Sequence, residues 1–586
     1  MSVEKIVSNV LVQDESTVWV LDEHKNFGYS DGVESERYLE KVFKGATDLS
    51  SGSSELETYV KDWPSEYHLA SKRAQLFAGF EFDSSLKVLE VGGGCGAITR
   101  YLGETFDDVV SVEGSIHRAR LARMRTAGMD NVSIICSPFQ EIQFTEKFDI
   151  IFCVGVYEYS SSFVSGDDPY DSVLSYFSDL LSPTGMVVIA IENQFGLKYF
   201  NAAREDHTGT LFEGLEGYRV HGEKVRTFGK NELQNNLKKH FSAIDMYYPY
   251  PDYKLPTCIA SEEFLASPGA GELVSQLKSR DYGGDLGEQW DESLVTLELA
   301  KNGMLPFFSN SFLAIAAKSE VTGVSFDQLA IMISTRRAPK FRTVTRIVEE
   351  PDGTRSAIKS PMSGNQEVTE GQLVLRETRS EWVEGRSLQA RLIDSCLSGE
   401  KRLDILFAPC TEWIEHLLDN SEEVDGVKMI DGTFIDCTFA NVFIESGEVS
   451  VIDWEWDWTE KLQLNVVVLR AIFLFLDKLH GSEKGASALG SVSTRELTIQ
   501  IALTMGIRLE PSDFRDFVEL ESTLQSIVLG ESKGRRGFIL RWNLWHRASY
   551  RFVAKSINFG RSVIVRVKRI GYRIVFRFIG RAAKSG

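Results

Sequence analysis

The 586-residue sequence has little cysteine and no long hydrophobic run. Its seven cysteines are scattered without a Cys-x-x-Cys pair, and no histidine cluster has the spacing of a zinc site, which fits a protein of the reducing cytosol. No window reaches the roughly 18 consecutive apolar residues of a membrane-spanning helix. Residues 1–14 also lack the pattern of a secretory signal. We therefore expect a cytoplasmic protein unless one segment attaches it to a surface.

Acidic residues are missing from the C-terminal end. From Ser532 onward there are 15 lysines and arginines and no aspartate or glutamate, which leaves 49 of the 64 basic residues against all 84 acidic ones. Residues 1–531 thus carry a formal charge of −35, although the whole chain carries −20. Such asymmetry indicates a basic tail with a function of its own. At this length the chain is too long for one core, and three or more units are expected.

The most informative stretch is an apolar run at residues 86–91 that leads into a glycine-dense turn and a helix-like segment. The run predicts a buried strand, and the glycines let the backbone turn sharply and approach a ligand closely. The helix that follows has free N–H groups at its start. A nucleotide-like cofactor is therefore expected at the carboxyl end of the first strand of a doubly wound sheet.

Two acids accompany this turn. The first belongs to the pattern Glu-x-Gly-x-Gly-x-Gly, which differs from the dinucleotide pattern Gly-x-Gly-x-x-Gly and is formed by Glu90, Gly92, Gly94 and Gly96. The second, Glu113, ends an expected strand at residues 109–112 and is followed by Gly114 and Ser115. A carboxylate at that place can accept both ribose hydroxyls of an adenosine.

These residues resemble the class I AdoMet-dependent methyltransferases. The resemblance implies a Rossmann-like α/β domain with seven strands, in which Glu90 and the glycines line the methionine and ribose region and Glu113 holds the ribose. Further strands are expected at residues 131–136, 148–153, 186–191, 243–248 and 312–317. The resemblance also suggests that Tyr67 covers the cofactor, that Phe139 contacts adenine and that Gly155 binds the cofactor. It places Tyr157 and Glu158 near the transferred methyl group. Tyr67 could equally be a packed residue at a helix start, and Phe139 a core aromatic.

Candidates for removing a proton from the methyl acceptor are His207, Glu192 and Glu158. His207 is the first choice because imidazole titrates near neutral pH and its neighbours Glu205 and Asp206 could orient it. A loop histidine that only holds its own turn is the alternative.

Further phrases, at residues 192–200, 226–229, 248–256 and 310–313, resemble a bacterial group of methyltransferases encoded with cell-envelope polysaccharide enzymes. The likeness covers residues 27–318. It implies a glycan or lipid-linked glycan acceptor, such as O-antigen, and polysaccharide biosynthesis enzymes as partners, although a small molecule or protein acceptor stays open. We expect a leader at 1–58 and a methyltransferase domain at 59–320, with an insert at about 251–304 that shapes the acceptor pocket or a partner contact.

A second region with catalytic features is expected at residues 321–531. Alternating polarity at 340–347, a Pro-Asp-Gly turn and a strand ending at Lys359 resemble a kinase-like N-lobe, and residues 381–388 resemble the hinge of aminoglycoside- and choline-type phosphotransferases. The resemblance implies ATP and Mg²⁺: Asp436 would accept the substrate proton, Asn441 and Asp453 would hold Mg²⁺, and Lys359 would meet the phosphates.

Three departures from the kinase pattern favour a degenerate module that binds a glycan or a partner. No glycine-rich loop precedes Lys359, Phe434 replaces the usual histidine, and only 21 residues separate Lys359 from Glu381. In that reading the protein is a scaffold of polysaccharide biosynthesis.

The basic tail, residues 532–586, is expected to bind a membrane surface. At helical spacing, apolar residues such as Val563 and Val567 share one face, and arginines such as Arg566 and Arg573 lie on a neighbouring one. This pattern is typical of an interfacial helix on anionic lipid. Nucleic acid is a less favoured partner because the −35 body would repel it. Docking of the tail onto the acidic body is a further alternative. We therefore expect peripheral attachment to the inner face of the cytoplasmic membrane.

Overall fold

The computed structural model describes residues 3–21, 32–221, 224–282, 289–480 and 492–545, together with Gly284 and Ala488. It divides into two compact units, the first of residues 1–335 and 343–358, the second of residues 336–342 and the chain from 359 onward. The first unit therefore contains the leader and extends past residue 320, where the sequence placed a boundary. The predicted helical face at residues 563–578 lies outside the described residues.

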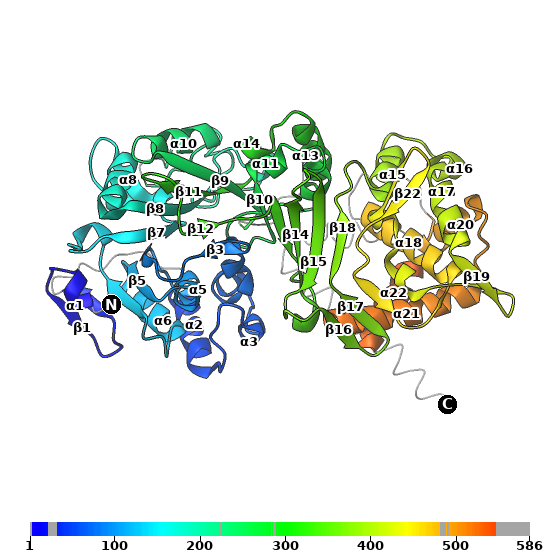
Figure 1. Ribbon diagram of the computed structural model, residues 1–586, viewed down its shortest axis with the longest axis horizontal. Helices are drawn as coiled ribbons and strands as arrows, with labels where there is room; N and C mark the ends of the chain where they lie inside the picture. Colours follow the sequence, from blue (N-terminus) through cyan, green and yellow to red (C-terminus); the bar gives the residue numbers. More distant parts are fainter. Residues whose placement is uncertain are drawn as a thin grey trace. The chain divides into compact units, whose positions relative to one another are not determined.

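The first unit is built on a mixed sheet with the strand order β6-β5-β4-β7-β8-β11-β9 at its centre (Figure 1). The strands are β4 (Lys87–Val91), β5 (Asp108–Glu113), β6 (Val132–Cys136), β7 (Phe148–Val154), β8 (Leu181–Glu192), β9 (Ala243–Tyr250) and β11 (Ser311–Ala317). Neighbours from β6 to β8 run parallel, and β11 is antiparallel to both β8 and β9. All seven predicted strands are confirmed. Their apolar runs follow from burial on both faces of the sheet.

Additional strands extend both edges of this sheet. From the leader, β2 (Trp19–Leu21) pairs in parallel with β6, and β1 (Leu11–Gln13) pairs with β2. At the other edge β10 (Cys258–Ser261), β13 (Ala330–Ile333) and β14 (Thr343–Glu349) follow β9. The sequence assigned the segment around β14 to a kinase-like lobe. β14 pairs with β13 and is grouped with the first unit, and the assignment of residues 321–531 to a kinase-like domain stays a prediction.

Helices cover the sheet of the first unit. α5 (Ala97–Thr105) and α6 (Ile116–Arg125) pack near β5, and α2 (Val33–Gly45) packs on α6. α8 (Pro169–Leu180) and α10 (Lys230–Lys238) lie together beside β8 and β9 (Figure 1). Short helices α4 (Trp63–Leu69) and η3 (Tyr157–Tyr159) reach the carboxyl ends of the central strands, where the candidate site lies.

The insert expected at about 251–304 contains β10 and several short helices: α11 (Glu262–Leu265), α12 (Ala270–Val274) and α13 (Glu292–Lys301). α12 packs on α13. The described part of the insert is thus partly helical.

The second unit combines small antiparallel sheets with a helical core. Lys359 lies on β15 (Arg355–Pro361), and β16 (Glu367–Glu370), β17 (Leu373–Arg376) and β23 (Trp456–Trp458) form one sheet. β21 (Val442–Glu445) and β22 (Glu448–Val451) form a hairpin. α18 (Leu464–Leu479) is buried over most of its length and contacts α20 (Thr494–Thr504) and α21 (Pro511–Leu529), which packs on α22 (Lys533–Trp545). Within the described part of the chain, no helix has the length and hydrophobicity needed to cross a bilayer.

Candidate active site

The glycine turn between β4 and α5 has the sharp geometry that the sequence predicts. Gly92, Gly94 and Gly96 have φ angles of 81°, 57° and 87°, a region that favours glycine. A Cβ atom on Gly93 would lie 2.2 Å from Ser111 Oγ. The turn therefore leaves no space for side chains on its sheet side, and the backbone itself is presented to the neighbouring cavity.

Glu90 lies below this turn at the end of β4. Its Oε2 accepts hydrogen bonds from Thr99 Oγ1 and Ser111 Oγ, both at 2.6 Å. Burial raises the pKa of Glu90 to about 7, although the two hydroxyl donors oppose the shift. Glu90 thus ties the turn to β5 and α5 and also lines the cavity.

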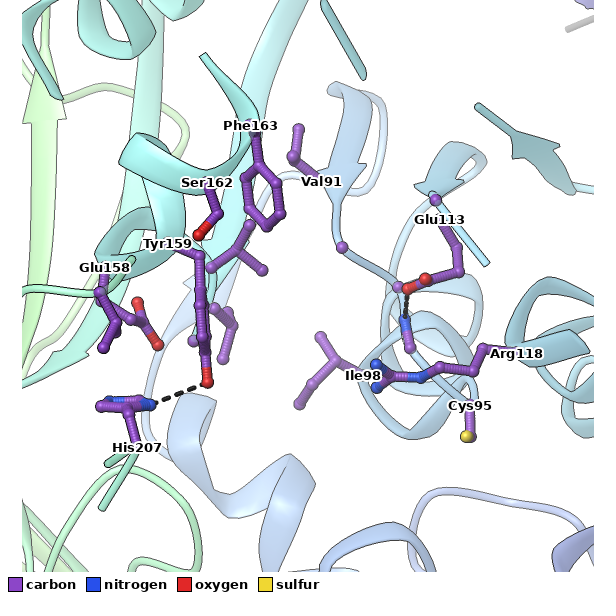
Figure 2. Close-up of a pocket in the computed structure, with 18 of the residues that line it drawn as sticks. Val91, Cys95, Ile98, Glu113, Arg118, Glu158, Tyr159, Ser162, Phe163 and His207 are labelled. Atoms are coloured by element: carbon purple, nitrogen blue, oxygen red, sulfur yellow. Dashed lines mark hydrogen bonds between the residues drawn. The ribbon is translucent and has the colours of Figure 1, made fainter. Parts of the chain in front are cut away.

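Glu113 at the end of β5 is fixed beside the turn (Figure 2). Gly94 N donates to its Oε2 at 2.8 Å, and Ser115 N donates to its Oε1 at 2.9 Å. Each carboxylate oxygen keeps a further lone pair, so Glu113 can still accept two hydroxyl groups. The carboxylate is therefore preorganised for a diol such as a ribose.

The cavity that these residues line has a volume of about 930 Å³. Eight of the predicted cofactor residues line it: Tyr67, Glu90, Gly92, Gly94, Glu113, Gly114, Phe139 and Gly155. Gly96 and Ser115 do not line it and act through the backbone of the turn. The Phe139 ring also packs on Phe177, and the Tyr67 ring lies 4.4 Å below the Arg73 guanidinium, so both aromatics are packed residues as well as wall residues.

Two of the candidate bases, Glu158 and His207, lie at the other side of this cavity from Glu113 (Figure 2), and Glu192 forms a cluster with them. Glu158 belongs to η3, Glu192 ends β8, and His207 comes from the loop beyond. His207 Nε2 lies 3.1 Å from Glu192 Oε2, and its Nδ1 lies 2.9 Å from the hydroxyl of Tyr159. Glu158 and His207 line the cavity. The fold thus brings His207 into one cluster with Glu192 and Glu158, which precede it in the sequence by 15 and 49 residues.

The prediction that Glu205 and Asp206 orient the His207 ring is wrong. Glu205 Oε2 accepts the backbone N–H of His207, and Asp206 pairs with Lys198 at 2.8 Å, so the ring is held by Glu192 and Tyr159 instead.

Electrostatics also argue against His207 as a free base. Burial opposes its protonation, but the Glu192 carboxylate outweighs burial and, with Glu205 and Glu158, raises the pKa of His207 to about 9. The ring is therefore charged at neutral pH, with both nitrogens in contact with a partner. In this arrangement it cannot take up another proton.

Glu158 differs from its neighbours because it lacks polar contacts. Its side chain is fully buried, and neither carboxyl oxygen has a hydrogen-bond partner in the described structure. Burial, with the nearby Glu192 carboxylate, raises the pKa of Glu158 to about 8. A buried carboxyl group without partners costs free energy, which indicates that a ligand completes this site.

Sequence reasoning missed the lysines of this cluster. Lys254 forms ion pairs with Glu192 and Asp206, and Lys198 forms a second ion pair with Asp206. Despite burial, Lys254 and His207 hold the pKa of Glu192 well below its usual range. Both lysines lie within phrases that the sequence analysis singled out, so the one available signal was a charged residue among aromatic neighbours.

In the second unit, the predicted kinase-like residues form two pairs: Lys359 contacts Asp453, and Asn441 contacts Asp436. Lys359 Nζ lies 2.5 Å from Asp453 Oδ1 and 3.0 Å from Glu455 Oε1. Asn441 Nδ2 donates to Asp436 Oδ2 at 3.1 Å. Burial raises the pKa of Asp453, and Lys359 opposes that shift.

The sequence did not indicate two further residues that belong to the group around Lys359, namely Arg337 and Glu455. Arg337 binds both oxygens of Glu455, at 2.8 and 2.6 Å, and Glu455 in turn contacts Lys359. Glu455 follows Asp453 by two residues, which puts both acids within reach of the same lysine.

Comparison with known proteins bears on the first unit. Residues 89–189 match the family described as methyltransferase domain. This region is a class I AdoMet-dependent methyltransferase domain. The match spans β4 to β8, and the fixed Glu113 carboxylate and open glycine turn of this methyltransferase domain fit the adenosine and methionine ends of AdoMet. No curated protein matches the chain.

Solved structures of methyltransferases resemble part of this protein. A putative methyltransferase complex with the Trm112 activator from Haloferax volcanii is 14% identical, over 44% of this chain and 90% of that one, with a TM-score of 0.26. The N-methyltransferase NodS from Bradyrhizobium japonicum is 12% identical, over 42% and 95%, with a TM-score of 0.25. Phosphoethanolamine N-methyltransferase 2 from Haemonchus contortus, solved with S-adenosyl-L-methionine, is 16% identical, over 49% and 57%, with a TM-score of 0.27.

Proposed function

We propose that the methyltransferase domain transfers a methyl group from AdoMet to a hydroxyl group of a cell-envelope glycan, an O-antigen or related polysaccharide, and so modifies or caps the chain end. The observation that carries the proposal is one cavity lined both by the Glu113 turn and by the cluster of Glu158 and His207. A donor site at one side and an acid–histidine cluster at the other place the methyl donor and ionisable groups on opposite sides of one acceptor position, as O-methylation requires.

The protein's own residues have two tasks in this reaction. Bound AdoMet supplies a methyl group that its sulfonium already activates, so that the acceptor oxygen bonds to carbon while the C–S electrons stay on sulfur. The turn and Glu113 fix the direction of the donor, and such alignment can supply about 7 kcal/mol of the barrier. The acid–histidine cluster acts on the hydroxyl proton, an assistance of roughly 10²–10⁴ in rate.

The glycan assignment is supported by how the resembling phrases meet at the acceptor side. Asn193 N donates to Asn310 O at 3.0 Å, and Lys198 N donates to Asn310 Oδ1 at 3.1 Å. Asn310 Nδ2 donates to Pro251 O at 2.9 Å. Three segments distant in sequence, residues 192–200, 248–256 and 310–313, are thus hydrogen-bonded to one another next to Glu192 and Lys254. The cavity wall adds aromatic rings and charged groups, a mixture suited to a sugar.

The test is incubation of the full chain with labelled AdoMet and a panel of lipid-linked glycans, read by mass. We expect a gain of one methyl group on a glycan of the panel, strongly reduced at limiting AdoMet when Glu113→Ala weakens donor binding. Transfer to small molecules or proteins but to no glycan would contradict the proposal. Transfer to none of these classes would favour a scaffold role for the protein.

A second candidate function is phosphotransfer from Mg·ATP by the second unit, which would phosphorylate the glycan end or grip it. It is favoured by the contact of Lys359 with Asp453 and of Asp436 with Asn441, which brings together the residue types that hold phosphates and Mg²⁺ in kinase sites. Equilibrium binding of Mg·ATP to the full chain tests it. No binding at millimolar ATP would identify a degenerate module.

We also propose attachment to the inner face of the cytoplasmic membrane, beside the polysaccharide biosynthesis enzymes, through residues 532–586. Support comes from α22, on which Phe538 and Trp545 are 65% and 66% exposed among basic residues. Deletion of residues 532–586 should release the protein from liposomes containing anionic lipid. Persistent binding would place the attachment elsewhere.

A further inference from the structure

We propose that Glu158, Glu192 and His207 form a binding site for one divalent first-row transition-metal ion at the acceptor side of the methyltransferase cavity. Two carboxylates and one imidazole are a donor set that Mn²⁺, Fe²⁺ and Zn²⁺ accept. The inference deepens the proposed function, on which its role in methyl transfer rests.

The geometry of the three side chains fits a common ion. One ligand atom of each residue lies within 4.8 Å of the others. His207 Nε2 and Glu192 Oε2 are 3.1 Å apart. Two neighbouring ligands at about 2.1 Å from an octahedral ion are about 3.0 Å apart, so this pair already has the required separation. Glu158 needs only a small closure to complete the set.

The groups around these ligands also fit a metal site. A histidine ligand usually donates its other ring N–H to an oxygen, which fixes the tautomer and ring direction. Here the Tyr159 hydroxyl lies 2.9 Å from His207 Nδ1 and can accept that proton, which leaves Nε2 for the ion. Lys254 contacts Oε1 of Glu192 and so leaves Oε2, the oxygen that faces His207, for coordination.

Glu158 provides an independent observation that points to a ligand at this place. It is fully buried, and both of its carboxyl oxygens lack a hydrogen-bond partner in the described structure. Glu158 and His207 line the cavity, so an ion held by them would keep open positions toward the acceptor. The hydroxyl oxygens of a sugar can occupy such positions. An ion bound to a hydroxyl lowers its pKa, so the cluster would act on the acceptor through the metal and the proton would leave to water.

The test uses the full chain after dialysis against a chelator, with Mn²⁺ as the probe and loss of its free EPR signal as the measure. We expect one Mn²⁺ per chain, displaced by Zn²⁺. Glu158→Gln and Glu192→Gln should each weaken Mn²⁺ binding at least tenfold, since an amide oxygen is a poorer ligand than a carboxylate. Asp171→Asn is the matched control, because Asp171 contacts His240 Nε2 at 3.0 Å outside the cluster. It should leave Mn²⁺ binding unchanged.

A measurement on the unsubstituted protein covers the case in which the variants do not fold. Pulsed EPR of the Mn²⁺ complex should show coupling to one imidazole nitrogen. No stoichiometric binding, no nitrogen coupling, or equal affinity in folded Glu158→Gln would overturn the site. Methyl transfer to a glycan that continues in excess chelator would overturn the metal's role while leaving the proposed function intact. Mn²⁺ binding without any methylated glycan would reject the proposed acceptor but keep the site.

Discussion

Replacement of Glu113 tests the donor site most directly. Its carboxylate holds the backbone N–H groups of Gly94 and Ser115 at 2.8 and 2.9 Å and has two lone pairs left for ribose hydroxyls. A hydrogen bond to a charged group contributes about 1.5–3 kcal/mol, so two lost ribose contacts amount to about 3 kcal/mol at the low end. We therefore expect Glu113→Ala to weaken AdoMet binding about 100-fold.

Glu113→Gln gives a graded result that separates contact from collapse. The amide keeps one acceptor oxygen but turns an N–H₂ group toward a backbone N–H, so about a tenfold loss is expected. Glu298→Ala, on an exposed part of α13, is the control and should bind like the unsubstituted protein. Calorimetric titration with AdoMet and with S-adenosylhomocysteine measures all four proteins. Equal affinity in Glu113→Ala, with the protein folded, would refute the placement of the donor against this turn.

Three further predictions concern Glu90, Gly93 and Lys359. The pKa of Glu90 is raised from 4.5 to about 7 in the folded state, so its stabilising contribution is present below pH 4.5 and is lost as pH rises through 7. The unfolding free energy of Glu90→Gln minus that of the wild type should therefore rise by about 3 kcal/mol between pH 5 and pH 8. It is measured on the unfolding transition that AdoMet stabilises. The same difference at both pH values would contradict this. Gly93→Ala should lower the unfolding free energy by about 1–3 kcal/mol and weaken AdoMet binding, because its Cβ would lie 2.2 Å from Ser111 Oγ. The control Gly52→Ala should change neither, because its Cβ meets no atom within 4 Å. Thermal unfolding and calorimetric titration measure the two effects. Lys359→Met should lower Mg·ATP affinity at least tenfold, by about 1.4 kcal/mol or more, without changing AdoMet binding; equal ATP affinity would remove Lys359 from a nucleotide site.

The central fold could be predicted because its signals are local. The central strands β4, β5, β6 and β7 are short apolar runs, and burial on both faces is what makes such a run continuous. The turn after β4 could be predicted for the same reason, since its glycines follow the strand directly and both acids lie at the ends of their strands. The alternating polarity at 340–347 predicts the strand that the structure has as β14, but alternation does not say which sheet a strand joins. The backbone partner of a strand is a long-range property.

The acceptor side shows the limit of sequence reasoning more clearly. Glu158, Glu192 and His207 were each found as single candidates, but their roles depend on residues far along the chain. Lys254 is 62 positions from Glu192, and Tyr159 is 48 from His207. Without these partners, a histidine in a polar loop suggests a neutral base.

The same partners decide what this cluster can do. Once Glu192 carries an ion pair with Lys254 on one oxygen, its other oxygen is left for His207, and the histidine becomes charged. Glu158 then remains the only member of the three without a polar partner in the described structure. We therefore expect chemistry at this side to begin at Glu158, by a proton or by an ion that all three share. A general base and a metal centre differ in whether the cluster binds an added metal ion. The metal titration therefore distinguishes them more directly than any single substitution.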